Sequence, residues 1–222
     1  MSIKHRVAAA CAALILSACG IGKPIPQATT YIIEPAAPVS SSEIRRDDSL
    51  RMGSVRVASA FAGNALVYRL DDVKYVSDPY HAFIADPGAM LGNRIAEWLD
   101  SAGPFKTVTQ PGSAQSSTSA PYVLDVTVTE LYGDMRTGAR PAAVMTVQFT
   151  VLDTAEPRAV TVYARTMTHR VEIEQATPDA LVRGYGKALS DILSQVRSDL
   201  TSLPPGQPAP KAQVPALAPK PS

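Results

Sequence analysis

The chain of 222 residues is poor in the residues on which most enzyme signatures depend: it has two cysteines, three histidines and one tryptophan. It contains no HExxH, CxxC, GxSxG or glycine-rich phosphate-binding motif, so nothing in it indicates a metalloenzyme, a serine hydrolase or a nucleotide-binding enzyme. Its 21 basic and 20 acidic residues nearly cancel, which removes the electrostatic reason to expect a nucleic acid partner. We therefore expect a protein without catalytic activity, metal or cofactor.

The first 19 residues have the features of an export signal that ends in a lipidation site. A basic start at residues 4–6 precedes the mostly apolar stretch 7–16, which is too short to span a bilayer. The stretch ends in LSAC at residues 16–19, which resembles the lipobox of bacterial lipoproteins. There the chain is cut before the cysteine, and the sulfur is acylated. We expect a signal peptide at 1–18 and a covalent lipid, such as palmitate, on Cys19. An ordinary secretory signal or a buried N-terminal helix is the alternative.

Acylation of Cys19 has consequences for location and stability. One fatty chain alone gives only reversible membrane binding, whereas several chains make release very slow. Gly20 follows the cysteine in place of the aspartate that implies inner-membrane retention, which favours the periplasmic face of the outer membrane. Cys11 is lost with the signal peptide, so the mature domain has neither a disulfide nor a free thiol. Its stability must therefore come from a packed core.

Residues 29–203, after a short tether at 19–28, are predicted to form one domain. Alternating or β-rich runs predict strands at 29–34, 51–59, 65–69, 73–76, 105–109, 122–132, 143–152 and 160–171. Residues 40–48 and 111–120 are expected to be loops, and residues 71–72 a hairpin turn. The two runs at 122–132 and 143–152 each have one apolar face, which is typical of an antiparallel sheet covered on one side. A change of parity near Ala164 predicts a bulge or a sheet edge there.

Two amphipathic helices complete the predicted domain. Asp86-Pro87 and Thr177-Pro178 are helix starts, each with a capping side chain followed by proline. Apolar residues then recur at helical spacing, at Leu91, Ile95, Trp98 and Leu99 and again at Leu181, Tyr185, Leu189, Ile192, Val196 and Leu200. The predicted fold is α+β, a two-layer domain of a mostly antiparallel sheet with both helices packed on one face. Residues 204–222 contain seven prolines and are expected to form a disordered tail.

A group of aromatic residues lies in the middle of a chain that has only 6% aromatics: Tyr68, Tyr75, Tyr80 and Phe83. Packing at the edge of the core explains such a group most simply. The alternative is a docking surface for a partner protein, since tyrosine is enriched among the residues that dominate binding energy. Both interpretations stay open at the level of sequence.

The order of these features resembles the ABC-type transport auxiliary lipoproteins, the PqiC-like family. The resemblance is carried by TTYIIEP at residues 29–35, LVYR at 66–69, YHAF at 80–83, the apolar helix that follows and the long final helix. It covers residues 29–203.

The resemblance implies a noncatalytic subunit of an intermembrane lipid transport system. Its implied partners are a mammalian-cell-entry (MCE) protein, which offers lipids an apolar conduit, with the permease and ATPase of the inner membrane. The lipoprotein would dock the MCE conduit at the outer membrane, as a homo-oligomer that matches a ring-shaped partner. An envelope scaffold that binds or activates a peptidoglycan-synthesis enzyme is the alternative.

Overall fold

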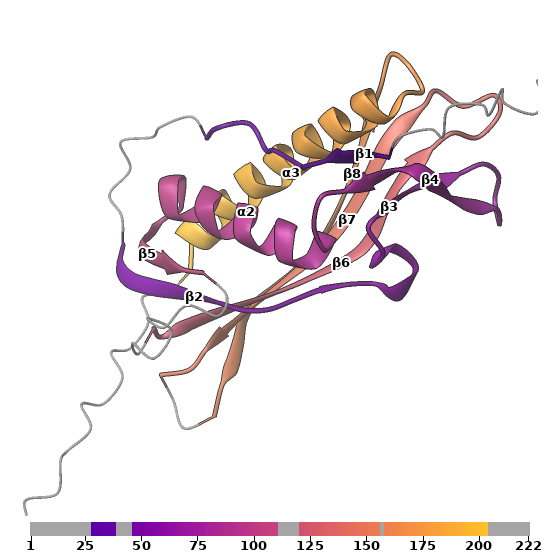
Figure 1. The fold of residues 1–222 in the computed structure, drawn as a ribbon. Helices are drawn as coiled ribbons and strands as arrows, with labels where there is room; N and C mark the ends of the chain where they lie inside the picture. Colours follow the sequence, from indigo (N-terminus) through magenta and orange to yellow (C-terminus); the bar gives the residue numbers. More distant parts are fainter. Residues whose placement is uncertain (1–27, 39–45, 111–119, 156–157, 204–222) are drawn as a thin grey trace, which may run out of the picture.

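The computed structural model describes residues 28–38, 46–110, 120–155 and 158–203. The predicted signal peptide, the lipidation site Cys19, nearly all of the tether and the proline-rich tail lie outside these ranges. Eight strands and two longer helices make up the described domain, which confirms the α+β class (Figure 1). In chain order these elements, with one short 3-10 helix, are β1 (Thr29–Tyr31), β2 (Arg46–Val57), η2 (Ser59–Phe61), β3 (Ala65–Arg69), β4 (Tyr75–Phe83), α2 (Pro87–Ala102), β5 (Phe105–Thr109), β6 (Tyr122–Asp134), β7 (Ala142–Asp153), β8 (Val160–Glu172) and α3 (Pro178–Thr201).

Strand β6 organises the sheet, because both of its edges are used along most of its length. One edge pairs with β7, which in turn pairs with β8, and both pairings are antiparallel. The other edge is shared: β2 pairs with the first half of β6 and β3 with its last two residues, both in parallel. Beyond them, β5 extends β2 and β1 extends β4 in parallel, while β3 and β4 form an antiparallel hairpin. The sheet is therefore mixed, with its antiparallel pairing in β6–β7–β8 and in the β3–β4 hairpin.

The alternation of the long strands positions the core. The helix-facing residues of β6 (Tyr122, Leu124, Val126, Val128) and of β7 (Met145, Val147, Phe149, Val151) are all buried. In the described part of the chain β8 pairs only with β7, and its register shifts at Tyr163. The predicted bulge or edge near Ala164 is confirmed, since both are present.

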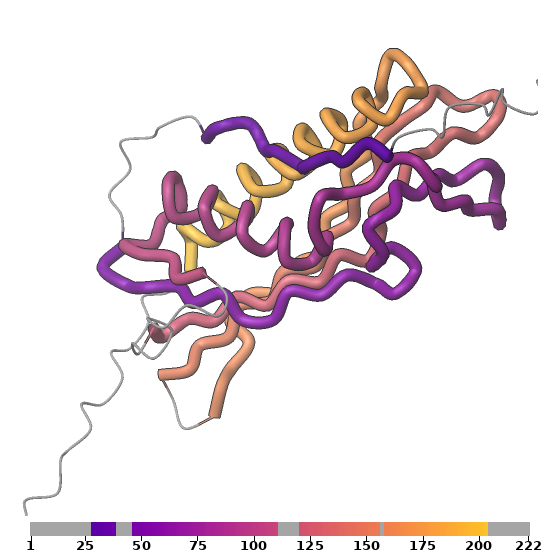
Figure 2. The backbone as a smooth tube through the Cα atoms, in the orientation of Figure 1, coloured from indigo at the N-terminus to yellow at the C-terminus, as the bar shows by residue number. Residues whose placement is uncertain are grey.

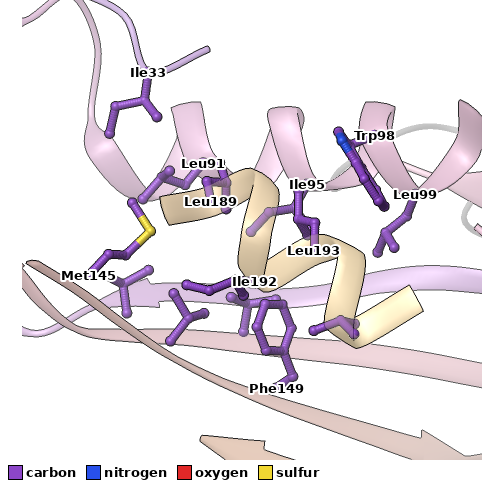
Figure 3. Close-up of a cluster of buried hydrophobic side chains, with 14 of the residues drawn as sticks. Ile33, Leu91, Ile95, Trp98, Leu99, Met145, Phe149, Leu189, Ile192 and Leu193 are labelled. Carbon is purple, nitrogen blue, oxygen red and sulfur yellow. The ribbon is translucent and has the colours of Figure 1, made fainter. Parts of the chain in front are cut away.

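Both helices begin where their caps predict. The Asp86 carboxylate accepts the amide of Ala89 at 2.8 Å, and the Thr177 hydroxyl accepts that of Ala180. The apolar faces of α2 and α3 pack on the same face of the sheet and against each other (Figure 3), as expected. No helix in the described ranges is long and apolar enough to cross a membrane.

The segment that follows β1 crosses both helices and fixes their spacing. Ile33 is buried, and the Trp98 indole donates to the Ala36 carbonyl at 3.1 Å. The amide of Ala36 donates to the Ser190 hydroxyl at 2.7 Å. A side chain at position 186 would overlap the Glu34 carbonyl oxygen, so the close approach of this segment to α3 requires Gly186.

The elongated domain has two distinct ends (Figure 2). One end carries the turn between β3 and β4, the loop between β6 and β7, and Ala28, where the described chain begins. We call it the hairpin end. The opposite end carries the start of β8 and the end of α3, where Arg46 donates a hydrogen bond to the carbonyl of Leu203. We call it the tail end.

Candidate docking surface on the β3–β4 hairpin

A compact turn at residues 70–74 joins β3 to β4. The Asp71 carboxylate accepts the amides of Val73 and Lys74 at 2.8 and 2.7 Å, and the Leu70 amide donates to the Lys74 carbonyl at 2.9 Å. These backbone hydrogen bonds stabilise the carboxylate and lower the pKa of Asp71. The predicted turn at residues 71–72 is confirmed. Its geometry turns the side chain of Val73 outward, where it is 89% exposed.

Tyr75 follows the turn, and one side of its ring packs against other aromatic side chains. Its ring meets Tyr132 of β6 edge-on at 5.4 Å between centroids, and Phe61 lies 6.3 Å away. The guanidinium of Arg69 lies over the same ring, 5.7 Å from its centroid. Partial burial raises the pKa of the Tyr75 phenol, yet 42% of the residue remains exposed. Tyr75 is thus rigidly held and accessible, as binding residues often are.

Asp78 holds the bend in β4 that presents Tyr80. One of its carboxylate oxygens accepts the amides of Tyr80 and His81, and the other accepts the Tyr68 hydroxyl at 3.0 Å and lies 2.8 Å from Nδ1 of His81. Burial acts to raise the pKa of Asp78, but these hydrogen bonds outweigh it and lower the pKa. Burial and the bond to Asp78 raise the pKa of Tyr68. Tyr80 itself is 46% exposed.

Phe83 belongs to the interior. It is 4% exposed, and its ring lies 6.3 Å from that of Tyr185 on α3. The docking interpretation is therefore wrong for Phe83, because strand β4 turns this position toward the helices. Tyr68 is only partly accessible, so the accessible aromatic residues of the predicted group are Tyr75 and Tyr80.

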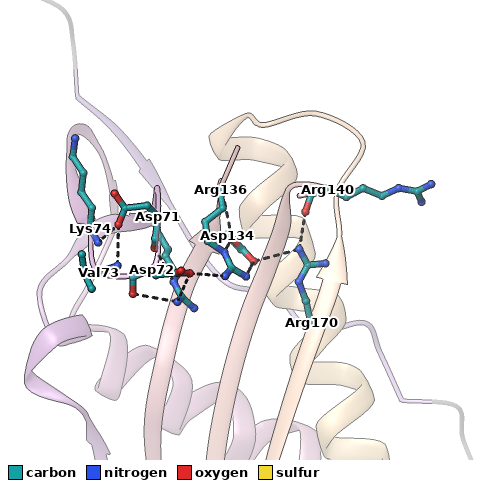
Figure 4. Close-up of polar contacts among 9 residues, drawn as sticks. Asp71, Asp72, Val73, Lys74, Asp134, Arg136, Arg140 and Arg170 are labelled. Atoms are coloured by element: carbon teal, nitrogen blue, oxygen red, sulfur yellow. Dashed lines mark hydrogen bonds and ion pairs between the residues drawn. The ribbon is translucent and has the colours of Figure 1, made fainter. Parts of the chain in front are cut away.

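Charged residues behind the turn lock the hairpin onto the sheet (Figure 4). Asp134, 2% exposed at the end of β6, pairs with Nε of Arg136 at 2.9 Å and with Arg170 of β8 at 3.3 Å. Arg136 also reaches Asp72 in the turn, at 3.2 Å, and Arg170 donates to the Arg140 carbonyl at 2.7 Å. The hydrogen bonds from Arg136 lower the pKa of Asp134 to about 2. The network gives the turn a fixed position.

We expect Asp134→Asn to destabilise the domain by about 2 kcal/mol at neutral pH, because the folded state lowers the pKa of Asp134 to about 2. A depressed carboxylate pKa stabilises the fold above the ordinary value of 3.8 and loses that contribution as the pH falls toward 2. Urea unfolding at pH 7, 4 and 3 should therefore show a gap between wild type and variant that closes with acid. Asp72→Asn is the matched control: it removes an 85%-exposed partner of the same arginine and should cost under about 1 kcal/mol. A stability difference between wild type and Asp134→Asn that does not change with pH would contradict a lowered pKa of Asp134.

Two features of this surface were not predicted from the sequence. Phe61 and Tyr132, which support Tyr75, are distant in sequence and meet it only because η2 and β6 run beside the hairpin. The outward position of Val73 depends on the Asp71 hydrogen bonds; an apolar residue directly after two aspartates in a turn was the available signal. Among the residues that the structure describes, no group of three or more His, Cys, Asp or Glu is placed to hold a metal ion.

Comparison with known proteins places this architecture. The family model of the ABC-type transport auxiliary lipoprotein component matches residues 31–197. A crystal structure from Xanthomonas campestris, of a protein of family DUF330, is similar with a TM-score of 0.66 at 15% identity, covering 78% of this chain and 95% of that one. The crystal structure of an uncharacterized protein has a TM-score of 0.59 at 18% identity, covering 78% and 99%.

These two structures show the shared fold. No curated protein has significant sequence similarity to the chain. Because the family model spans nearly the whole described domain, from β1 to the last turns of α3, the chain belongs to the family of ABC-type transport auxiliary lipoprotein components.

Proposed function

We propose that this protein is a periplasmic lipoprotein, anchored in the outer membrane through Cys19, that serves an ABC/MCE-type intermembrane lipid transport system as a noncatalytic subunit. Its role would be to dock the MCE conduit at the outer membrane, while the ATPase and permease act at the inner membrane. The observation that carries the proposal is the family match over residues 31–197, in a chain whose residues 16–19 are the LSAC sequence.

The packing of the domain supports docking rather than lipid carriage. The apolar faces of α2 and α3 cover the helix-facing side chains of β6 and β7. Phe149, Ile192 and Ile95 are among the buried residues (Figure 3). An acyl chain exposed to water loses about 0.8 kcal/mol for each methylene. A conduit that delivers lipid must therefore end close to a membrane, and a membrane-tethered subunit that binds its end would meet this requirement.

Co-purification of the full-length, lipidated protein from native membranes tests the function. We expect an ABC-type ATPase, a permease and an MCE-domain protein to be recovered together after cross-linking, and mass spectrometry of the complex to find bound phospholipid. Recovery of a penicillin-binding protein without transporter subunits would contradict the proposal and favour the envelope-scaffold alternative.

The exposed tyrosines of β4 are the proposed partner contacts. Replacing Tyr75 and Tyr80 by alanine should remove about 2 kcal/mol of binding energy at each, roughly a 30-fold loss of affinity, as for tyrosines at protein interfaces. Val160→Ala, at the tail end and 52% exposed, is the matched control and should bind normally. Binding of each variant to the co-purified MCE protein, with circular dichroism melting as a check of the fold, measures the effect. Unchanged affinity of the folded double variant would exclude this surface.

A further inference from the structure

The chain enters the domain at the hairpin end, and this limits how far the hairpin can lie from the membrane. Ala28 lies nine positions after Cys19 in sequence (28 − 19 = 9). A fully extended chain spans at most about 3.6 Å per residue, so the acylated sulfur lies within roughly 32 Å of Ala28. This step rests on the acylation of Cys19 proposed above.

The direction of β1 brings Ala28 to the end of that strand which is nearer to the hairpin turn. β1 runs parallel to β4 with Thr29 opposite His81, so its first residue faces the turn. Tyr75, where β4 begins, lies six positions before His81 (81 − 75 = 6), which is at most about 20 Å of strand and less where the register of β4 shifts between Ser77 and Ala82. The turn therefore extends beyond Ala28 by less than the reach of the tether, and it can touch the surface of the bilayer that holds Cys19.

The side chains at the turn suit a lipid surface. Val73 is 89% exposed and Val76 is 36% exposed, and Lys74 and Tyr75 lie between them in sequence. Tyrosine is enriched at membrane interfaces, an exposed valine gains free energy when it leaves water, and a lysine beside them can extend its ammonium to lipid phosphates. The acidic residues of the turn are already engaged: Asp71 by backbone amides and Asp72 by Arg69 and Arg136.

We propose that residues 71–76, the tip loop, form a second membrane contact that inserts Val73 among the phospholipid headgroups of the leaflet that carries the acyl chains of Cys19. A single valine would not hold a protein at a membrane, but the tether keeps the tip loop at a high effective concentration near the lipid. The contact orients the domain. Its hairpin end stands on the leaflet, Tyr80 lies beside the bilayer, and the tail end points away from it.

A fluorescent label at position 73 tests the contact in the lipidated protein. Because the mature chain has no cysteine other than Cys19, Val73→Cys introduces the one free thiol, and an environment-sensitive dye can be attached to it. The protein is reconstituted alone in vesicles of phosphatidylethanolamine and phosphatidylglycerol. We expect blue-shifted emission and quenching of about twofold or more by lipids brominated near the headgroup. The same dye on Val160→Cys, at the tail end, should show neither effect.

The outcomes separate this inference from the docking proposal, since no transporter subunit is present. Equal emission from positions 73 and 160 would overturn it. A blue shift that appears only after addition of the MCE protein would assign the tip loop to a protein contact, and a concentration-dependent shift in detergent without lipid would assign it to a second copy of the chain; either result overturns the lipid contact. Mass analysis of the same sample reports the acyl chains of Cys19 independently, and a bare sulfur would overturn the anchor as well.

Discussion

Replacing Cys19 by alanine is expected to abolish retention of the protein in envelope membranes. The sulfur is the proposed attachment point of the fatty chains, and each buried methylene contributes about 0.8 kcal/mol to membrane binding, so removal of several chains eliminates the anchor. Fractionation of cells that express the variant, with incorporation of radiolabelled palmitate as a second readout, measures the change. We expect an unprocessed or soluble product without label.

Cys11→Ala provides the matched control, because it alters the other cysteine of the chain within the predicted signal peptide. This variant should be processed and labelled like the wild type. Membrane retention and palmitate labelling of Cys19→Ala would show that the lipobox assignment is wrong, and the proposed location in the envelope would then lose its basis.

Phe83→Ala should lower the free energy of unfolding by about 3–5 kcal/mol, the range for truncating a buried phenylalanine. Phe83 is 4% exposed and packs near Tyr185, so alanine would leave a cavity between β4 and α3. For a domain of this size the melting temperature should fall by roughly 10 °C. Thermal and urea unfolding of the purified protein measure the loss.

Two further variants separate core packing from docking at this hairpin. Phe83→Leu keeps most of the buried volume and should lose less than half as much stability. Tyr80→Ala removes a side chain that is 46% exposed and should cost under about 1 kcal/mol. A stable Phe83→Ala variant that fails only in partner binding would restore the docking interpretation for that residue.

The long strands and both helices could be predicted because their local patterns agree with their final environments. In β6 and β7 each alternate residue is buried against the helices, and Asp86 and Thr177 cap the helices that they were expected to cap. The pairing of neighbouring strands could not be predicted in the same way. Alternation indicates that a strand has one covered face, but it does not specify a partner, and so the parallel pairing of β2 with β5 and β6 could not be derived from it.

The boundaries of β1, β2 and β4 differ most from the predicted ones. β1 ends at Tyr31 and not at Glu34, because the chain then leaves the sheet and buries Ile33. Residues 46–48, predicted as loop, begin β2, because the Arg46 guanidinium lies over the rings of Phe105 and Tyr122 and pairs with Asp48 at 2.8 Å. Beyond residue 76, β4 continues to Phe83 although Pro79 interrupts the pattern. The Asp78 carboxylate accepts the amides of Tyr80 and His81 where the register of the β3–β4 pairing shifts. The start of β2 thus depends on residues distant in sequence, whereas the continuation of β4 depends on local side-chain hydrogen bonds that an alternating pattern does not record.

The four residues of the predicted aromatic group lie on the same hairpin, but they do not form one exposed surface. Tyr75 and Tyr80 are accessible, whereas Phe83 faces the core and Tyr68 is held by Asp78. The register of β4 shifts beside Asp78, so simple alternation does not predict which face Tyr80 and Phe83 occupy. The MCE partner, the outer-membrane location and a homo-oligomeric state stay predictions that the experiments above address.

The shared edge of β6 has a consequence for how the chain acquires its structure. Leu50 of β2 pairs with Tyr122 of β6, 72 positions later in sequence (122 − 50 = 72), and β2 has parallel partners only among the described strands. Pairings this distant close large loops and are slow to form. During N-terminus-first synthesis, β2 therefore cannot complete its pairing until β6 has been made. The topology itself would delay compaction and keep the chain threadable through an export pore.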